Sequence, residues 1–204
     1  MKKLLIVVLV LICFLMGCKK VQITPDDPTP IDFVRVDFDE ANISTVTIGN
    51  QIWMAENLKV TVDANGNRLD SRSINDDRNN DDIYGRLYTF YEAQAACPAG
   101  WHLPSIEEWE ELFDTLGGIE VAGGKMKTVE YWNQPNAGAT NSSGFNAVPS
   151  GGYHDGFGWA CHFWSSTEDG DNAYIPSIMN SGEDVYILYD QSKSNLCLVR
   201  YIRD

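Results

Sequence analysis

Few side chains in this sequence have the spacing that catalysis or metal binding needs. The three histidines, His102, His154 and His162, have no second ligand at the spacing of a structural zinc site. His102 stands between Trp101 and Leu103, which favours a packed, hydrogen-bonded imidazole over a catalytic one. The chain has 29 acidic residues, so no two carboxylates stand out as the pair of a glycosidase. We therefore expect neither a metal site nor enzymatic activity.

One acidic segment has part of a calcium-binding pattern. Asp63, Asn65 and Asn67 have the spacing at which a calcium loop begins. Such a loop needs glycine at its sixth position and glutamate at its twelfth, but the sixth residue is Arg68 and no glutamate follows. We expect residues 63–82, rich in Asp and Asn, to form a long surface loop. Bound calcium is compatible with the acidity of the chain but no motif indicates it, and no cofactor is expected.

The start of the chain has the pattern of an export signal. A charged start over residues 1–3 precedes an apolar run over residues 4–16, which is shorter than the about 20 residues of a membrane-spanning helix. Residues 15–17 are Leu-Met-Gly and precede Cys18, and this boundary resembles the lipobox of bacterial lipoproteins. That resemblance implies cleavage after residue 17 and acyl chains on Cys18. Two or more chains anchor a protein firmly in a bilayer.

These features predict the layout of the chain. We expect a signal peptide over residues 1–17, the lipidated cysteine and a proline-rich tether over 18–33, and a globular domain over 34–204. The expected place is the cell envelope, with the lipid anchor in the outer membrane. The formal net charge of −14 argues against a nucleic-acid partner, because phosphate binding needs a basic face.

Local patterns predict the elements of the domain. Residues 46–54 alternate between apolar and polar types around Gly49-Asn50, which predicts a β-hairpin. Residues 87–96 can form a helix. A second helix is expected over residues 105–116, because Ser105 and Glu108 have the spacing of a capping box. Its apolar residues recur at helical spacing on one face: Ile106, Trp109, Leu112, Phe113 and Leu116.

The rest of the domain is rich in loops. Short strands are expected near residues 145–148, 161–165, 184–189 and 197–202. Two adjacent helices followed by short strands and long loops predict an α+β fold. Besides Cys18, the mature chain keeps Cys97, Cys161 and Cys197, so an exported protein could form at most one internal disulfide among these three.

Several blocks of the sequence resemble the Fib-succ-major paralogous domain (FISUMP). Residues 50–59, NQIWMAENLK, resemble the family's "NQxWMAENLK" start, and residues 84–90, YGRLYTF, resemble its "YGRLYTW" segment. Residues 96–109, ACPAGWHLPSIEEW, resemble "ACPxGWHLPSxxEW". Two later blocks, NSSGFNA at 141–147 and FWSST at 163–167, also match. The resemblance covers roughly residues 46–204.

The resemblance implies a relative of the C-type lectin-like fold, with two helices, short antiparallel strands and long loops. In that fold a cysteine at the first helix commonly pairs with one near the last strand, so Cys97 and Cys197 are the corresponding candidates. The sequence departs from the family here. The family usually ends like "SVRCV", whereas Val199-Arg200 is followed by Tyr201, and the cysteine stands three positions earlier than the motif.

The resemblance also implies where a ligand would bind. C-type lectin-like domains usually hold their ligand on the long-loop region, where aromatic rings can stack on a sugar or peptide while carboxylates and amides contact polar groups. In this sequence a glycine-rich aromatic loop and the segment after the FWSST block correspond to that region. The candidate residues are Tyr153, Asp155, Trp159, Glu168, Asp169, Asp171 and Asn172. The triplets of calcium-dependent sugar-binding lectins are missing from the sequence.

We expect a surface or periplasm-facing lipoprotein whose domain binds a glycan or protein ligand without catalysis, in addition to the bilayer that holds Cys18. Two alternatives stay open. The domain could be a structural or tip subunit of a fimbria-like surface assembly, or an enzyme acting on glycans or peptides.

The lipid anchor is directly testable. Replacing Cys18 by serine removes the sulfur that would carry the acyl chains. We expect the Cys18→Ser variant to lose labelling by radioactive palmitate and to leave the membrane fraction. Unchanged labelling and membrane retention in the variant would refute lipidation at this residue.

Overall fold

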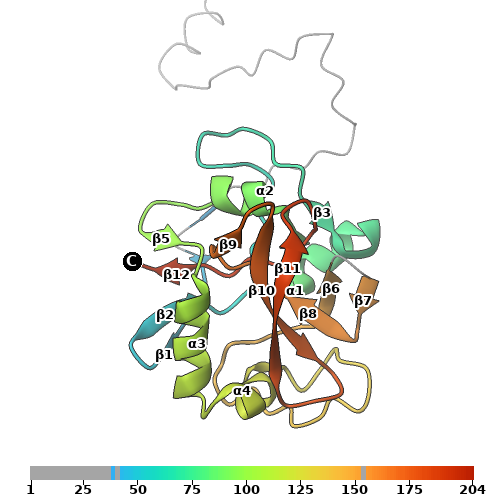
Figure 1. The fold of residues 1–204 in the computed structure, drawn as a ribbon. Coiled ribbons are helices and arrows are strands. Elements are labelled where there is room, and N and C mark those ends of the chain that lie inside the picture. Colours follow the sequence, from blue (N-terminus) through green and yellow to red (C-terminus); the bar gives the residue numbers. More distant parts are fainter. Residues whose placement is uncertain (1–37, 40–41, 153–154) are drawn as a thin grey trace, which may run out of the picture. The chain divides into compact units, whose positions relative to one another are not determined.

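A computed structural model of the protein describes residues 38–39, 42–152 and 155–204 (Figure 1). The signal peptide, Cys18 and the tether, predicted over residues 1–33, lie outside the described residues, as does Tyr153. The described part mixes helices with β-sheets, so the predicted α+β class is confirmed.

Two of the α-helices start at residues whose side chains satisfy free backbone amides. Ser105 Oγ accepts from Glu108 N at 3.3 Å, while Glu108 Oε2 accepts from Ser105 N at 2.8 Å, which confirms the predicted capping box. Thr89 and Glu92 form the same box one helix earlier. The α-helices of the described residues are α1 (Asp81–Tyr84), α2 (Phe90–Ala95), α3 (Ile106–Thr115) and α4 (Ile119–Met126), and 3₁₀ turns cover Ile74–Asp76 (η2) and Arg78–Asn80 (η3).

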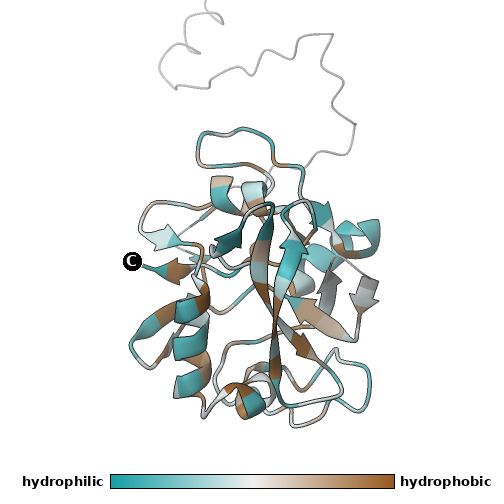
Figure 2. Cartoon of the chain, viewed as in Figure 1, coloured by the Kyte–Doolittle hydropathy of each residue, from teal (hydrophilic) through white to brown (hydrophobic). Residues whose placement is uncertain are grey.

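Helix α3 buries the face that its sequence predicts. Trp109, Leu112 and Phe113 are almost fully buried, and Leu116 just beyond the helix is 8% exposed. Figure 2 shows hydrophobic and hydrophilic bands alternating along this helix. The sequence reading missed α4, because Gly123 and Gly124 argue against a helix. Tertiary contacts require both glycines, since a Cβ at Gly123 would lie 2.5 Å from the Asp184 carbonyl oxygen.

The strands form separate sheets. One sheet has the order β1-β2-β12-β5 and a larger one the order β11-β10-β8-β6-β7, with β9 also paired to β10 and β3 paired to β4. The first sheet contains β1 (Thr45–Ile48), β2 (Gln51–Met54), β12 (Ile202–Arg203) and β5 (Trp101–His102). The larger sheet contains β6 (Ser150–Gly152), β7 (Asp155–Phe157), β8 (Ala160–His162), β9 (Glu168–Asp169), β10 (Asn172–Met179) and β11 (Val185–Ser192). The small pair is β3 (Arg72–Ser73) and β4 (Arg86–Leu87).

Comparison with the predicted strands shows one correct hairpin and one large omission. The β1–β2 hairpin turns at Gly49-Asn50, as predicted. Strand β10 was not predicted, because Pro176 interrupts its pattern and proline lacks the N–H that a central strand donates. Pro176 takes part in the ladder through its carbonyl alone, which accepts from Phe163 N at 3.0 Å. The expected strand at 145–148 is absent from the described residues except for a single bridge at Ala147. The expected loop at 63–82 contains β3 and two 3₁₀ turns.

Two buried clusters fill the domain. Trp53, Trp109, Phe145 and Phe163 form the aromatic centre of the first, with ring centroids 4.6 to 5.9 Å apart. The second is built around α2 and includes Tyr88, Phe90, Trp164, Cys197 and Tyr201. Strand β10 contributes to both, with Ile178 in the first cluster and Ile175 in the second.

The expected Cys97–Cys197 disulfide is not formed in this structure, in which Cys97, Cys161 and Cys197 are free thiols. Cys197 pairs with Tyr88 before α2 begins, whereas Cys97 follows the end of that helix. The Cys97 thiol donates instead to the Trp101 carbonyl at 3.1 Å. Tyr201, at the family's usual cysteine position, reaches α2 through its hydroxyl, which donates to the Ala93 carbonyl at 2.6 Å.

Arg200 is the largest charged side chain in the core, at 1% exposure. Its guanidinium donates four hydrogen bonds, and none of the acceptors is a carboxylate. Nε donates to Asn57 Oδ1 at 2.6 Å, Nη1 to the Met54 and Phe145 carbonyls at 2.8 Å, and Nη2 to the Asn146 carbonyl at 3.0 Å. The guanidinium carbon lies 4.6 Å from the centre of the Phe145 ring. Burial lowers the pKa of Arg200 to about 9.

Lysine cannot replace this guanidinium, because one ammonium cannot reach acceptors on three sides of a planar fork. We expect Arg200→Lys to lower the free energy of unfolding by about 2–4 kcal/mol, since several buried acceptors lose their donors. Urea unfolding measures the change. Arg203→Lys, at an exposed arginine of the same strand region, should change stability by less than about 0.5 kcal/mol. Equal stability of Arg200→Lys and the parent protein would contradict the assigned role.

His102 in β5 joins that strand to α3 and to the residue that follows β12. Its Nε2 lies 2.8 Å from Glu108 Oε1 and its Nδ1 lies 2.7 Å from Asp204 Oδ1. Burial alone would lower the pKa of the imidazole, but the hydrogen bonds to the two carboxylates outweigh it and the pKa of His102 is raised. This agrees with the prediction of a packed, hydrogen-bonded histidine.

The raised pKa makes part of the stability depend on pH. A base whose pKa is raised by folding adds stability that is complete below its unfolded pKa of about 6.5 and is lost as the pH rises through the folded pKa. We expect the melting temperature to fall over that window in the parent protein, and His102→Gln to remove this component. The comparison uses thermal melts of both proteins from pH 5.5 to 9. An equal slope in the variant would show that another group titrates.

Candidate functional site

The sequence predicts one ligand surface from the loops around Trp159 and over residues 168–172, but the structure separates these loops. Trp159 lies in the turn before β8, where Ala160 pairs with Met179 at one end of β10. Glu168 pairs with Ala173 at the other end of β10. An extended strand rises about 3.3 Å per residue, so the two loops are on the order of 20 Å apart. They do not form one site.

The segment over residues 168–172 is held by a lysine. Lys193 Nζ lies 2.5 Å from Glu168 Oε2 and donates to the Gly170 carbonyl at 2.5 Å, while its N–H donates to the Asp171 carbonyl. Glu168, Asp169 and Asp171 are exposed, and Asn172 begins β10. These contacts describe a β-turn fixed to the residue that follows β11. No aromatic side chain of the turn itself is available for stacking.

The turn that carries Trp159 contacts residues 131–134, and not residues 168–172 as predicted. Asn133 N donates to the Gly158 carbonyl at 2.7 Å, which joins the turn to the segment over residues 131–134. Asn180 ties both together, because its N–H donates to the Trp159 carbonyl at 2.8 Å and its Nδ2 donates to the Asn133 and Gln134 carbonyls at 3.1 Å. The space between them is tight, since a Cβ at Gly158 would lie 2.5 Å from Asn133 Nδ2.

This junction presents two large aromatic side chains to solvent. Trp159 is 51% exposed and Tyr131 is 49% exposed. Tyr131 also has a φ of 74°, a left-handed conformation that is a genuine outlier for a bulky residue. Such strain persists only where the surroundings impose it, and it is common at functional sites. We call Tyr131, Asn133 and Trp159 the aromatic surface. Tyr131 was not predicted, because the residues next to it in sequence indicate neither its strained backbone nor its proximity to the Trp159 turn.

A row of rings connects the aromatic surface to a hollow. The Tyr84 ring lies 5.8 Å from Tyr131 and 5.0 Å from Phe157, in edge-on contacts. Phe157 lines a hollow of about 430 Å³, within the range of about 300–1,000 Å³ typical of ligand pockets. The other lining residues are Arg72, Ser73, Ile74, Asn75, Asp76, Leu87, Ser150 and Leu196. Asp155, a predicted site residue, begins the strand that carries Phe157.

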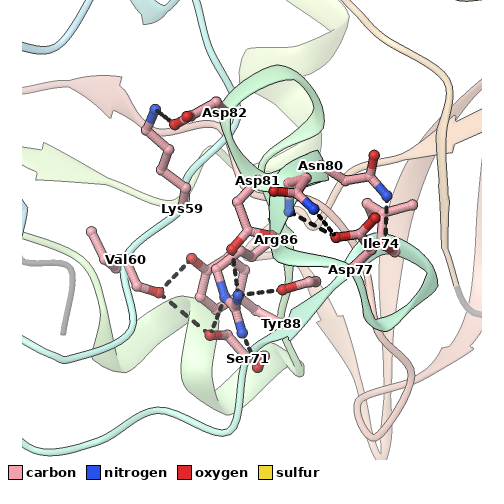
Figure 3. Close-up of polar contacts among 12 residues, drawn as sticks. Lys59, Val60, Ser71, Ile74, Asp77, Asn80, Asp81, Asp82, Arg86 and Tyr88 are labelled. Atoms are coloured by element: carbon pink, nitrogen blue, oxygen red, sulfur yellow. Dashed lines mark hydrogen bonds and ion pairs between the residues drawn. The ribbon is translucent and has the colours of Figure 1, made fainter. Parts of the chain in front are cut away.

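A hydrogen-bonded turn over residues 74–77 forms one wall of the hollow. Asn75 and Asp76 have φ values of 55° and 54°, and Asp77 N donates to the Ile74 carbonyl, which is the geometry of a type I′ turn. Asparagine and aspartate tolerate this conformation. Beneath the turn, Arg86 Nη1 donates to Ser73 Oγ and to Asp81 Oδ2, both at 2.6 Å. Figure 3 shows Arg86 between Asp81 and Ser71, with the Tyr88 hydroxyl on the Val60 carbonyl.

The loop that carries Tyr131 is held by a buried ammonium. Lys127, with no exposed surface, donates to the Ala137 and Gly182 carbonyls at 2.7 Å and to the Met179 carbonyl at 3.1 Å. Its Nζ lies 5.4 Å from the centre of the Trp132 ring. Burial lowers the pKa of Lys127. The ammonium thus ties the segment after α4 to the end of β10 and to the turn that follows.

Groups capable of other chemistry are occupied elsewhere. Asp63 Oδ1 accepts from Asn65 N at 2.9 Å and from Asn67 N at 2.8 Å, so this carboxylate closes its own turn. Burial raises the pKa of the Cys97 thiol to about 11 and that of Cys161 to about 12, which disfavours the reactive thiolate. Within residues 38–39, 42–152 and 155–204, no three His, Cys, Asp or Glu side chains gather as metal ligands. No helix of this part is long and apolar enough to cross a membrane.

Comparison with known proteins gives one match. The family model described as the Fibrobacter succinogenes major domain matches residues 46–203, which include the aromatic surface, the hollow and Arg200. No curated protein and no solved structure matches the chain. Because the model covers most of its length, the chain belongs to the Fibrobacter succinogenes major domain family.

Proposed function

We propose that this domain binds a glycan, without catalysis, on the aromatic surface and the adjoining hollow. The observation that carries the proposal is the pairing of exposed Tyr131 and Trp159 on two loops that are hydrogen-bonded to each other. Exposed rings of this size are costly to leave in water and give a flat apolar area on which a sugar ring can stack.

The polar hollow supplies the complementary chemistry. Ser73, Asn75 and Asp76 offer a hydroxyl, an amide and a carboxylate along one wall, and Arg72 adds a guanidinium. A saccharide presents apolar ring faces beside many hydroxyls, so it matches an aromatic platform next to such a wall. The rigid connection through Asn180 and Lys127 also favours binding, because little loop ordering is needed when a ligand arrives.

The cellular setting and fold relationship are part of the same proposal. A chain acylated on Cys18 would hold the domain in the cell envelope, at the outer membrane, with the tether over residues 18–33 as a spacer. A distant relationship to C-type lectin-like domains would be consistent with recognition on loops and with the helices as scaffold. The Leu-Met-Gly boundary before Cys18 supports the lipid anchor, and the sequence blocks over residues 50–167 support the fold relationship. Palmitate labelling of Cys18→Ser tests the anchor.

Two substitutions test the site. A glycan array probed with the full chain in detergent micelles identifies a glycan, and calorimetry then measures its affinity. We expect Trp159→Ala and Tyr131→Ala each to weaken binding by about 1–3 kcal/mol, because each removes a stacking ring. Their melting temperatures should stay near that of the parent protein, since both side chains are half exposed.

Tyr91→Ala is the matched control, because Tyr91 is 63% exposed on α2 and belongs to neither the aromatic surface nor the hollow. It should bind the glycan normally. Normal binding by both site variants would move the site elsewhere. A large loss of melting temperature in Trp159→Ala would instead show that this indole supports the fold.

A further inference from the structure

Strand β11 has an open edge. It lies at the end of the sheet order β11-β10-β8-β6-β7 and has eight residues. Outside its ladder with β10, no described residue hydrogen-bonds to the backbone over residues 185–191. Helix α4 contacts the start of β11, and just before the strand Gly124 N of that helix donates to the Glu183 carbonyl at 2.9 Å.

The register shows which groups face outward. Pro176 and Ile178 of β10 turn their backbone groups toward β8, as the Pro176 carbonyl does when it accepts from Phe163 N. In an antiparallel pair the residues opposite such positions also point away from the shared ladder. The opposite residues are Ile187 and Val185. Their N–H and C=O groups therefore lie on the free edge, where another strand could form hydrogen bonds with them.

This edge lacks the usual protection against pairing. Natural edge strands carry charged side chains, proline or bulges, and in β11 Asp190 and the bulge both fall in the second half. Residues 185–192 contain neither lysine nor proline, and the irregularity of the β10–β11 pairing falls beyond Leu188. The exposed side chains include Tyr186 at 49% and Tyr189 at 60%, and the Tyr189 ring packs edge-on at 5.0 Å against Tyr174. The first half of β11 is thus a regular, partly aromatic template.

Charge selects the kind of chain that fits. Residues 163–192 contain no lysine, arginine or histidine, although Lys193, which pairs with Glu168, follows directly. Glu183 and Asp184 precede β11, and Asp190 lies within it. A second copy would bring the same acids to the contact, and each copy has a formal charge of −14. A basic segment would instead gain attraction on approach.

We propose that β11 accepts an extended segment of another protein, with basic residues at its ends, as an added strand. The backbone of Val185 and Ile187 supplies the hydrogen bonds, Tyr186 and Tyr189 pack against alternate side chains, and the flanking acids pair with the basic ends. This contact is separate from the aromatic surface and would join the domain to a protein partner while its glycan site stays free.

Amide exchange and one proline test the proposal. The probe is a synthetic peptide of alternating threonine and valine with lysine at each end, added to the full chain in detergent micelles and followed by NMR. Without peptide, the Val185 and Ile187 amides should exchange at least tenfold faster than those of Tyr186 and Leu188. Peptide should slow the Val185 and Ile187 amides at least tenfold.

Ile187→Pro removes the outward N–H but leaves the β10 ladder intact, because proline is tolerated where the N–H faces solvent. It should weaken peptide binding at least tenfold, whereas the matched control Ile187→Thr and the Trp159→Ala variant should bind as the parent protein does. A peptide with glutamate ends should bind more weakly than the lysine peptide.

Several results would overturn the proposal. Protection of the Ile187 amide in the absence of peptide would mean that the edge is already covered, and sedimentation of a dimer under those conditions would identify a second copy as the occupant. Equal binding by Ile187→Pro and Ile187→Thr would exclude strand addition, and equal binding of the lysine and glutamate peptides would exclude selection by charge.

Discussion

The fold depends on one buried cation that has no carboxylate beside it. Arg200 is surrounded by the Asn57 side chain and by the carbonyls of Met54, Phe145 and Asn146, which come from segments about 55 to 146 residues away in sequence. A guanidinium can stay in such a place only if most of its N–H groups find acceptors, since each one left unpaired costs about 1–3 kcal/mol. The segments that carry Met54–Asn57 and Phe145–Asn146 must therefore meet at this residue, and both lie within the residues that the family model matches.

The same contacts set the position of the candidate site. Asn57 accepts from Arg200 and also donates through Nδ2 to the Tyr84 carbonyl at 2.8 Å, so the residue that satisfies the guanidinium also fixes the central ring of the aromatic row. Gly85 allows this approach, because a Cβ there would lie 2.4 Å from the Asn57 Cβ, a clash that no side chain could avoid. On the other side, Asn146 anchors the start of the segment that leads to Ser150 and the hollow. A core constraint thus determines where surface residues are presented.

The sequence allowed prediction where structure is set by near neighbours. The β1–β2 hairpin and the α3 capping box depend on a turn and a four-residue motif, and both are correct. Helix α4 and strand β10 were missed, because Gly123 and Pro176 contradict local rules and are tolerated only through contacts with distant segments. Trp159 was identified as an exposed aromatic residue, but its partner Tyr131 was not, since the hydrogen bonds of Asn180 bring them together. The two cysteines of the expected disulfide are free in the structure, where Cys97 follows α2 and Cys197 pairs with Tyr88 before that helix.

Two further buried cations, Lys127 and Lys193, hold loops in this acidic chain. Lys127 ties the segment that carries Tyr131 to the turn after β10 through three backbone carbonyls, and Lys193 ties the turn before β10 to the end of β11 through the Gly170 carbonyl and the Glu168 carboxylate. A bound metal ion would also be surrounded by carbonyl oxygens. Here the positive charge at the centre is an ammonium that belongs to the chain. These loops therefore become ordered as the domain folds, because the cation is part of the chain and does not have to be bound from solution. With 29 acidic residues on the chain, long-range attraction offsets part of the cost of burying these charges. The acidity that keeps the surface hydrated therefore also helps to retain the cations that shape its loops.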